Sequence, residues 1–200
     1  AFGGSARAGE CLVEKLNHKY KFTIYNTATH TNRKTGYYGE YKQIVFRKFP
    51  IRKLNTFVYY VKSLLHCLFC AKYDLIHVYH IDAAFIIPIL KIRYKVIAGV
   101  RARPQLLSKW NLVEKQYFKC MEFVFLKMPP HIMTSNSIKI IEEYQSRTRR
   151  TIQYIPNGIL FNNEQKILPG IEYSDYILFA SGRIVESKGC HIFLKALRLI

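Results

Sequence analysis

Short runs of β-branched and aromatic residues alternate along this chain with longer stretches in which apolar residues recur at helical spacing. Near the start, the apolar or small residues Ala8, Cys11, Leu12 and Leu16 follow the period of an amphipathic helix. Apolar runs that alternate with such helices are typical of βαβ units, in which helices cover a mainly parallel sheet. The pattern therefore predicts an α/β fold.

The same pattern gives approximate limits for the individual elements. The predicted strands are Lys21–Asn26, Gln43–Arg47, Asp74–Tyr79, Tyr94–Ala98, His131–Ser135, Thr151–Pro156 and Asp175–Ser181. The predicted helices are Ala6–His18, Leu54–Lys72, Ala83–Lys91, Leu107–Lys127, Asn136–Arg147 and Cys190–Ile200. Strands and helices thus alternate through nearly the whole chain.

A change of composition predicts a domain boundary near residue 165. The turn signal Pro156-Asn157-Gly158 is followed by a polar segment at 162–166 and by the break Pro169-Gly170. We expect residues 1–165 to form a Rossmann-like N-terminal domain and residues 166–200 to begin a second one. One strand and one helix cannot bury both faces of a sheet, and no strand precedes the first helix. The sequence is therefore expected to be a fragment.

The balance of charge points to phosphate-bearing partners. Among 200 residues, 31 are Lys or Arg and 13 are Asp or Glu, which gives a formal net charge of +18. Half of the residues are hydrophobic, so a sizeable core is expected. A surface this basic attracts nucleotides, nucleic acid or anionic lipid, and composition does not choose among the three.

The cysteines and the apolar segments bear on location. The five cysteines are odd in number and scattered, which argues against a disulfide framework and suits a reducing cytoplasm. Cys67 and Cys70 have no second ligand pair at zinc spacing, and we expect two core thiols. The apolar stretch Leu75–Val100 contains charged residues and Pro88, so it does not predict a membrane-spanning helix. The expected location is cytoplasmic, with any membrane contact made from the surface.

The clearest candidate for phosphate chemistry lies between the last predicted strand and the last predicted helix. Gly182 and Arg183 open this turn, and Lys188 lies five residues after Arg183. A guanidinium can bind two phosphate oxygens, an ammonium supplies a point charge, and the start of a helix offers unpaired amides. The segment suits a diphosphate. An ordinary strand-to-helix connection in which Arg183 and Lys188 are simply solvated would contain the same residues.

Other polar residues follow the predicted strands of the N-terminal domain, where ligands of open α/β sheets bind. Tyr79 and His80 end one strand, although a single histidine there is more often a hydrogen-bonded structural residue. Arg101 and Arg103 follow the next strand and suit an anionic acceptor or a lipid phosphate, or simply a basic loop. The hydroxyl of Ser137 is expected to cap a helix.

Two further features complete the candidate residues. Gly3 and Gly4 stand before the first helix, where glycine lets a backbone approach a phosphate or a sugar, although a simple turn would contain them too. Arg147, Arg149 and Arg150 are expected to form a solvated face. No Walker-type loop, full dinucleotide fingerprint, serine-hydrolase elbow or zinc-protease motif is present, so these four chemistries lack support.

Taken in order, these segments resemble family 4 of the glycosyltransferases, which are retaining enzymes of the GT-B fold. The resemblance spans essentially the whole chain. The matching pieces are Phe2-Gly3-Gly4 with Glu10, Asp74–Tyr79, Thr134–Ser137 with Tyr144, Ile155–Gly158 and Gly182–Gly189. The succession of the last three pieces is its most specific part.

The resemblance implies two Rossmann-like domains that face each other across a cleft. Arg183 and Lys188 would hold the diphosphate of a nucleotide-sugar donor and neutralise the departing nucleotide, with no metal or other cofactor. Gly3 and Gly4 would lie against the donor phosphates and the transferred sugar. The basic N-terminal domain would fit an anionic membrane and a lipid-linked or saccharide acceptor, as in polysaccharide or glycolipid assembly.

This chain departs from the family pattern in two ways that leave alternatives open. Ala98 stands before Gly99, where many relatives carry a histidine or an acidic residue. The family's later pair of glutamates is not among these 200 residues. The leading expectation is a fragment of a hexosyltransferase-type enzyme, inactive alone. A relative that only binds is the alternative motivated by Ala98. A nucleic-acid binder is suggested by charge alone, and no recognisable module supports it.

Overall fold

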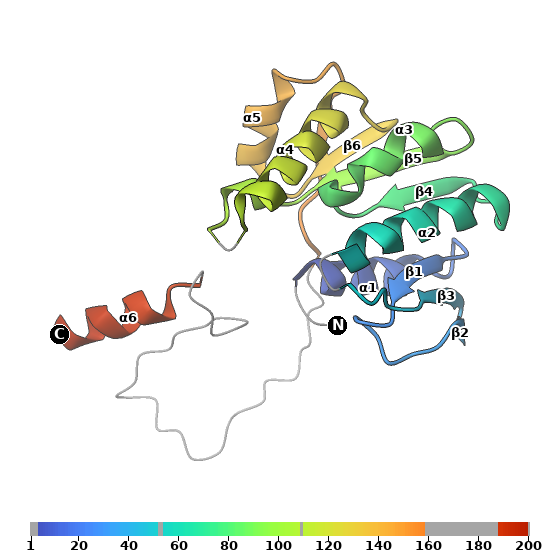
Figure 1. The fold of residues 1–200 in the computed structure, drawn as a ribbon, viewed down its shortest axis with the longest axis horizontal. Coiled ribbons are helices and arrows are strands. Elements are labelled where there is room, and N and C mark those ends of the chain that lie inside the picture. The colour runs from blue at the N-terminus through green and yellow to red at the C-terminus, as the bar shows by residue number, and fades with distance from the viewer. Residues whose placement is uncertain (1–3, 52–53, 109, 159–187, 200) are drawn as a thin grey trace, which may run out of the picture. The chain divides into compact units, whose positions relative to one another are not determined.

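The computed structural model describes residues 4–51, 54–108, 110–158 and 188–199 (Figure 1). The chain divides into two compact units, one formed by Val13–Gly158 and the other by Ala1–Leu12 together with Ile159–Ile200. Helix α1 (Gly4–Leu16) contains the division between them. The larger unit carries both β-sheets and most of the described helices.

The first sheet of the larger unit is small and has three strands. Its strand order is β1-β3-β2, where β1 is Thr23–Thr27, β2 is Gly36–Tyr38 and β3 is Tyr41–Phe46. β1 runs parallel to β3, whereas β2 and β3 form an antiparallel hairpin. Gly39 makes the hairpin turn possible, because its φ of 62° lies in the left-handed region that residues with a Cβ rarely adopt.

The second sheet has four parallel strands in the order β4-β5-β6-β7. The strands are Leu75–Val78, Lys95–Val100, Ile132–Ser135 and Ile152–Tyr154. Figure 1 shows β4, β5 and β6 side by side, and the parallel direction of the four strands places all four carboxyl ends at one edge. Val96, Val100 and Met133 are completely buried, which is why the strands read as apolar runs.

Helical segments connect the strands and complete the core. They are α2 (Asn55–Phe69), the 3-10 helix η2 (Ile81–Ile86), α3 (Ile87–Leu90), η3 (Pro104–Leu106), α4 (Leu112–Lys127) and α5 (Ile138–Gln145). A capping box starts α4: Asn111 Oδ1 accepts from the Glu114 amide at 2.8 Å, and the Asn111 amide donates to Glu114 Oε2 at 3.0 Å. In the smaller unit, α6 (Cys190–Ala196) and η5 (Leu197–Leu199) follow Gly189, whose φ is 75°.

The predicted α/β fold with a parallel sheet is confirmed for the larger unit, and three local expectations were wrong. The predicted helix Ala83–Lys91 is a 3-10 helix up to Ile86, because Pro88 lacks an amide hydrogen and belongs in a first helical turn. Residues 107–111 precede α4 because its cap is Asn111. Cys70 is exposed, whereas Cys67 is buried as expected.

The hairpin strand β2 was not predicted, because its three residues are too few to show alternation. The predicted strand Asp175–Ser181 lies outside the described residues. Among the helices that the structure describes, none has the length and apolarity needed to cross a membrane.

Candidate functional site

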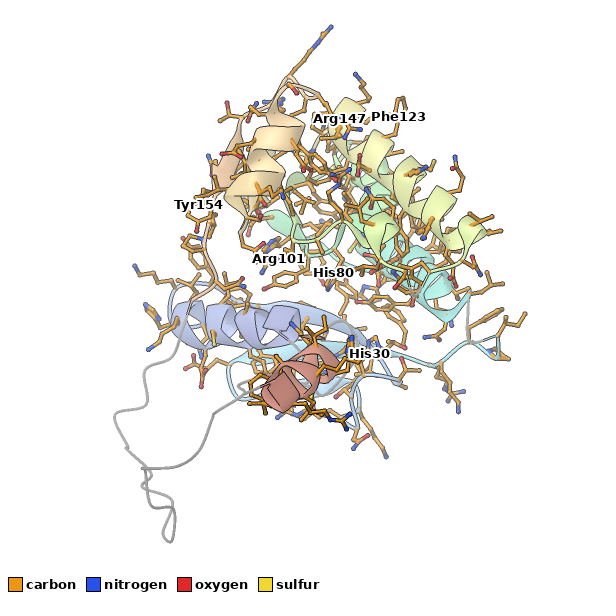
Figure 2. The ribbon with its side chains drawn as sticks, turned by 90° about the vertical axis from the view of Figure 1, so that its left-hand side faces the viewer. His30, His80, Arg101, Phe123, Arg147 and Tyr154 are labelled. Atoms are coloured by element: carbon orange, nitrogen blue, oxygen red, sulfur yellow. The ribbon has the colours of Figure 1, made fainter. Side chains whose placement is uncertain are left out.

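The carboxyl ends of β4, β5 and β7 bring three polar side chains together around Arg101. The guanidinium carbon of Arg101 lies 4.0 Å from the centre of the Tyr79 ring. Its Nη1 donates a hydrogen bond to Asn157 Oδ1 at 3.0 Å. His77 lies on β4, with its ring 5.1 Å from the ring of Tyr79. We call His77, Tyr79, Arg101 and Asn157 the Arg101 cluster, and Figure 2 labels Arg101.

Within this cluster, Arg101 carries the charge at neutral pH. Burial is the main cause that lowers the pKa of His77 from its usual 6.5 to about 4, and the positive charge of Arg101 adds to the effect. A neutral imidazole can accept or donate one hydrogen bond at each ring nitrogen. No ion pair of Arg101 is found among the described residues, and its two contacts above are with uncharged groups. The cluster is therefore a positively charged site.

Buried polar atoms without partners gather at the same edge of the sheet. Within the described part of the chain, the atoms His77 Nε2, Arg101 Nε, Arg103 Nε and Asn136 Oδ1 are buried and make no hydrogen bond. Most buried polar atoms in folded proteins are paired, so each exception calls for water or a ligand. Gly99 lies close to these atoms, because a Cβ there would lie 3.1 Å from Thr134 Oγ1 and 3.8 Å from Arg101 Nε.

Arg103 lies in a different environment from Arg101, against two carboxylates. It forms an ion pair with Glu143 on α5, and its Nε lies 3.8 Å from Glu122 Oε2 on α4. Glu122 is only 5% exposed and also accepts hydrogen bonds from Tyr144 at 2.5 Å and from Gln105. Its other oxygen pairs with Arg147 Nη1 at 2.8 Å. We call this set the Glu122 network.

The Glu122 network changes the interpretation of two predicted residues. Arg103, a candidate for the acceptor side, is held by carboxylates and so has a structural partner in place of a ligand. Arg147 was expected on a solvated face, yet it pairs with buried Glu122, although 47% of its side chain remains exposed (Figure 2). Burial, followed by the hydrogen bond to Glu122, raises the pKa of the Tyr144 hydroxyl, which therefore stays a donor.

The remaining predicted residues are spread over both units. His80 is exposed at the start of η2, and its ring contacts Tyr79 edge-on at a centroid distance of 5.7 Å. Ser137 caps α5 as predicted, by accepting from the Ile140 amide at 3.4 Å. In the smaller unit, Gly4 begins α1, and Lys188 is exposed just before Gly189 and α6. The predicted residues Gly3, Gly182 and Arg183 lie outside the described part of the chain.

Ala98 lies in the core and does not reach this edge. It is 1% exposed and pairs with Val78 and Met133 in the centre of the sheet. Position 98, where the family pattern considered for the sequence would place a histidine or an acidic residue, thus holds only a buried methyl group. Among the described residues, no group of three or more His, Cys, Asp or Glu is placed to hold a metal ion.

Two important residues were missed in the sequence. Asn157 was named as part of a turn and of the matching piece Ile155–Gly158, but not as a site residue, although the rule that parallel strands end at one edge would have placed it beside Arg101. Glu122 was not singled out in the sequence, although it stands between Met121 and Phe123 in an apolar stretch of α4. A carboxylate at such a position usually has a buried partner.

Comparisons with family models, with curated proteins and with solved structures found no match for this chain. What the Arg101 cluster can bind follows from its geometry. The Arg101 cluster offers one positive charge, a flat aromatic surface, an amide and a neutral imidazole at the ligand-binding edge of a parallel sheet. Such a set can bind an anionic or hydroxyl-rich molecule and can neutralise negative charge that develops near Arg101.

Proposed function

We propose that this chain is part of a retaining glycosyltransferase that moves a sugar from a nucleotide-diphosphate donor to an acceptor hydroxyl. In this proposal residues 1–165 belong to the acceptor-side Rossmann-like domain of a GT-B fold, and residues 166–200 begin the donor-side domain. The single observation that carries most weight is the position of Arg101, which is held by uncharged partners at the carboxyl edge of four parallel strands.

The proposed roles follow from the chemistry of each group. Arg183 and Lys188 bind the donor diphosphate. Gly182, and the separate loop at Gly3 and Gly4, lie close to it. As the bond between the sugar and the phosphate breaks, the two cations neutralise charge on the leaving diphosphate. The acceptor oxygen bonds to the sugar on the same face, and its proton passes to an oxygen of the departing phosphate. No metal or other cofactor is needed in this scheme.

On the acceptor side, the proposal uses Arg101, Tyr79 and His80. The exposed ring of His80, beside half-buried Tyr79, offers a surface on which a sugar can pack. Arg101 would bind an anionic group or a hydroxyl of a lipid-linked or saccharide acceptor. Arg103 is given no role in binding, because Glu122 and Glu143 already neutralise it.

The test measures release of nucleoside diphosphate from a panel of nucleotide sugars by the natural protein that contains this chain. Arg183→Ala and Lys188→Ala should each lower turnover by about 10²–10³-fold while leaving the far-ultraviolet circular dichroism unchanged. Arg149→Ala is the control, because Arg149 is exposed and should leave turnover intact. Near-normal turnover in both of the first two variants would contradict the proposal.

The burial of Ala98 favours a second candidate, a glycosyltransferase-like protein that binds a nucleotide sugar without turning it over. The same panel separates the two candidates. Calorimetric binding of a donor without release of diphosphate, over all acceptors tried, would favour the binding protein. Tight and steeply salt-dependent binding of generic DNA would instead support a nucleic-acid binder and count against both.

A further inference from the structure

The two faces of the four-stranded sheet differ at its carboxyl edge. Side chains alternate between the faces along a strand, and paired residues of neighbouring strands share a face. On one face, Val78, Ala98 and Met133 are paired in register and all are buried. On the other face, alternation places five polar residues and one glycine, which are His77, Tyr79, Gly99, Arg101, Thr134 and Asn136. We call these six residues the polar sheet face.

Gly99 lies in the middle of the polar sheet face. A Cβ at this position would lie 3.1 Å from Thr134 Oγ1 and 3.8 Å from Arg101 Nε. Because Gly99 and Thr134 are paired, the residues two positions further on, Arg101 and Asn136, follow on the same face of neighbouring strands. Both are half-buried, so core packing does not close this face as it closes the other. The polar sheet face therefore extends over three strands, a width of about 10 Å.

The hydrogen-bonding groups of this face define what a ligand must offer. His77 Nε2, Arg101 Nε and Asn136 Oδ1 are buried and have no hydrogen-bond partner in the described part of the chain. A guanidinium nitrogen only donates, an amide oxygen only accepts, and a neutral imidazole nitrogen does one of the two. A ligand that pairs all three atoms must bring both an acceptor and a donor. An ionised carboxylate or phosphate alone has acceptors only, whereas hydroxyl groups supply both.

The charge of the polar sheet face adds a second requirement. Arg101 forms no ion pair among the described residues. His77 is neutral, because burial and then the charge of Arg101 lower its pKa to about 4. A carboxylate brings one negative charge, whereas a phosphate monoester brings about 1.5 to 2 at neutral pH. The single charge of Arg101 is therefore balanced by one carboxylate, and a phosphate would leave part of its charge uncompensated.

A ligand can approach Arg101 from its exposed side. Arg101 Nη1 donates to Asn157 Oδ1 at 3.0 Å, and Asn157 is exposed. A carboxylate is a stronger partner for a guanidinium than an amide oxygen is, so it can take the place of Asn157. Such side-chain movements are common on binding. The ring of Tyr79, whose centre lies 4.0 Å from the guanidinium carbon, holds Arg101 in place meanwhile.

We propose that the polar sheet face binds a hexuronic acid unit, with its carboxylate on Arg101 and its ring hydroxyls at His77 and Asn136. A sugar acid is the molecule in which one carboxylate and several hydroxyl groups lie on the same ring. As the unit of the acceptor that receives the transferred sugar, it rests on the proposed function. Its binding does not, and can be measured without sugar transfer.

The experiment measures binding of small probes to the full chain by isothermal titration calorimetry. Methyl glucuronoside and methyl galacturonoside are the test probes. Methyl glucoside lacks the charge, propionate lacks the hydroxyl groups, and glucose 6-phosphate carries a phosphate instead. We expect at least one uronoside to bind about tenfold more tightly than each of these three. Equal binding of propionate, tighter binding of glucose 6-phosphate, or no binding of either uronoside would each overturn the proposal.

Two variants separate the carboxylate contact from the hydroxyl contacts. Arg101→Gln should weaken uronoside binding about tenfold, because it removes the charged partner. Asn136→Ala should weaken uronoside binding to a similar extent, yet leave propionate binding unchanged. The matched control is Arg149→Gln, which removes the same charge from an exposed position and should change binding less than about twofold. Equal losses in Arg101→Gln and Arg149→Gln would mean that net charge alone attracts the acid, and would overturn the proposal.

The His77 ring gives a second readout at the site itself. A bound carboxylate neutralises Arg101, so the pKa of His77, measured by nuclear magnetic resonance, should rise above about 4 on saturation with uronoside. An unchanged pKa would place the acid elsewhere and overturn the proposal. Release of diphosphate with neutral acceptors only would support sugar transfer and overturn the acidic acceptor. Uronoside binding that raises this pKa, without turnover of any donor, would support the site and count against the proposed function.

Discussion

Arg101 and Arg103 stand two residues apart after the same strand, yet their surroundings differ in charge. Arg103 lies among the carboxylates of Glu122 and Glu143, on α4 and α5. Arg101 contacts the face of Tyr79 and the amide oxygen of Asn157, which carry no charge. Beside it, the buried imidazole of His77 is kept neutral.

This difference separates a structural arginine from a candidate binding arginine. A charge that is buried with an opposite charge and hydrogen bonds holds neighbouring elements together, and its loss leaves the partners uncompensated. A charge without an opposite charge contributes little to stability and remains able to bind an anion. Binding sites are often built at the expense of stability in this way. The comparison therefore predicts that the same substitution lowers stability at Arg103 but not at Arg101.

The largest effect is expected when the centre of the Glu122 network loses its charge. Glu122→Gln keeps the size of the side chain but leaves Arg103 and Arg147 without their shared carboxylate. Removing one partner of a buried ion pair typically costs about 3 kcal/mol or more. Urea unfolding followed by circular dichroism should therefore show a free energy of unfolding lower by about 3 kcal/mol.

Glu142 provides the control for this prediction, because it lies exposed on α5 next to Glu143 in the sequence. Glu142→Gln should change the free energy of unfolding by no more than about 0.5 kcal/mol. If Glu122→Gln were as mild as this control, the carboxylate would not be the centre of the network. Arg103 would then lose its assignment as a structural residue.

The next effect compares the two arginines directly. Arg103→Gln should lower the free energy of unfolding by about 1–2 kcal/mol, because it removes one partner of Glu122 and Glu143. Arg101→Gln should leave stability unchanged or slightly raised, since it removes a charge without a carboxylate. Urea unfolding of both variants under the same conditions checks the pair. Equal losses at the two positions would remove the distinction between them.

The sequence predicted the sheet better than it predicted these arginines. Apolar runs marked strands β4 to β7 to within two residues at each end, and the inner strands β5 and β6 are the most buried of the four. The same rule placed Tyr79 and Arg101 at one edge. The partners of Arg103 could not be found in this way. Glu122 lies on α4 and Glu143 on α5, and helical periodicity does not say which helix faces of different elements meet.

Helix α2 (Asn55–Phe69) shows the same limit. Helical periodicity predicted a helix at Leu54–Lys72, and an apolar stripe normally predicts the buried face. In α2, Leu64 and Cys67 are buried in the core, whereas Leu65 and Phe69 are exposed. Because apolar residues lie on both sides of this helix, its sequence does not show which side faces the core.

A smaller effect should appear in the pH dependence of stability. The pKa of His77 is lowered from 6.5 to about 4, so between these values the unfolded chain binds a proton that the folded chain does not. The free energy of unfolding should therefore fall as the pH drops from 6.5 towards 4. In His77→Gln this fall should be smaller by about 1–2 kcal/mol, which allows for partial access of water to the ring. If the free energy of unfolding fell equally with pH in the parent chain and in His77→Gln, the burial of a neutral His77 would be contradicted.

The smallest effect tests whether Arg101, and not Arg103, acts on His77. Arg101 is the second cause of the lowered pKa of His77, after burial. In Arg101→Gln the pKa of His77 should rise towards its usual value without reaching it, because the ring stays buried. Titration of the His77 ring protons by nuclear magnetic resonance measures this change. In Arg103→Gln the pKa of His77 should stay where it is, since the charge of Arg103 is already neutralised by Glu122 and Glu143. A similar rise in both variants would mean that His77 responds to net charge alone, and the positive site at the carboxyl edge of the sheet would no longer be assigned to Arg101.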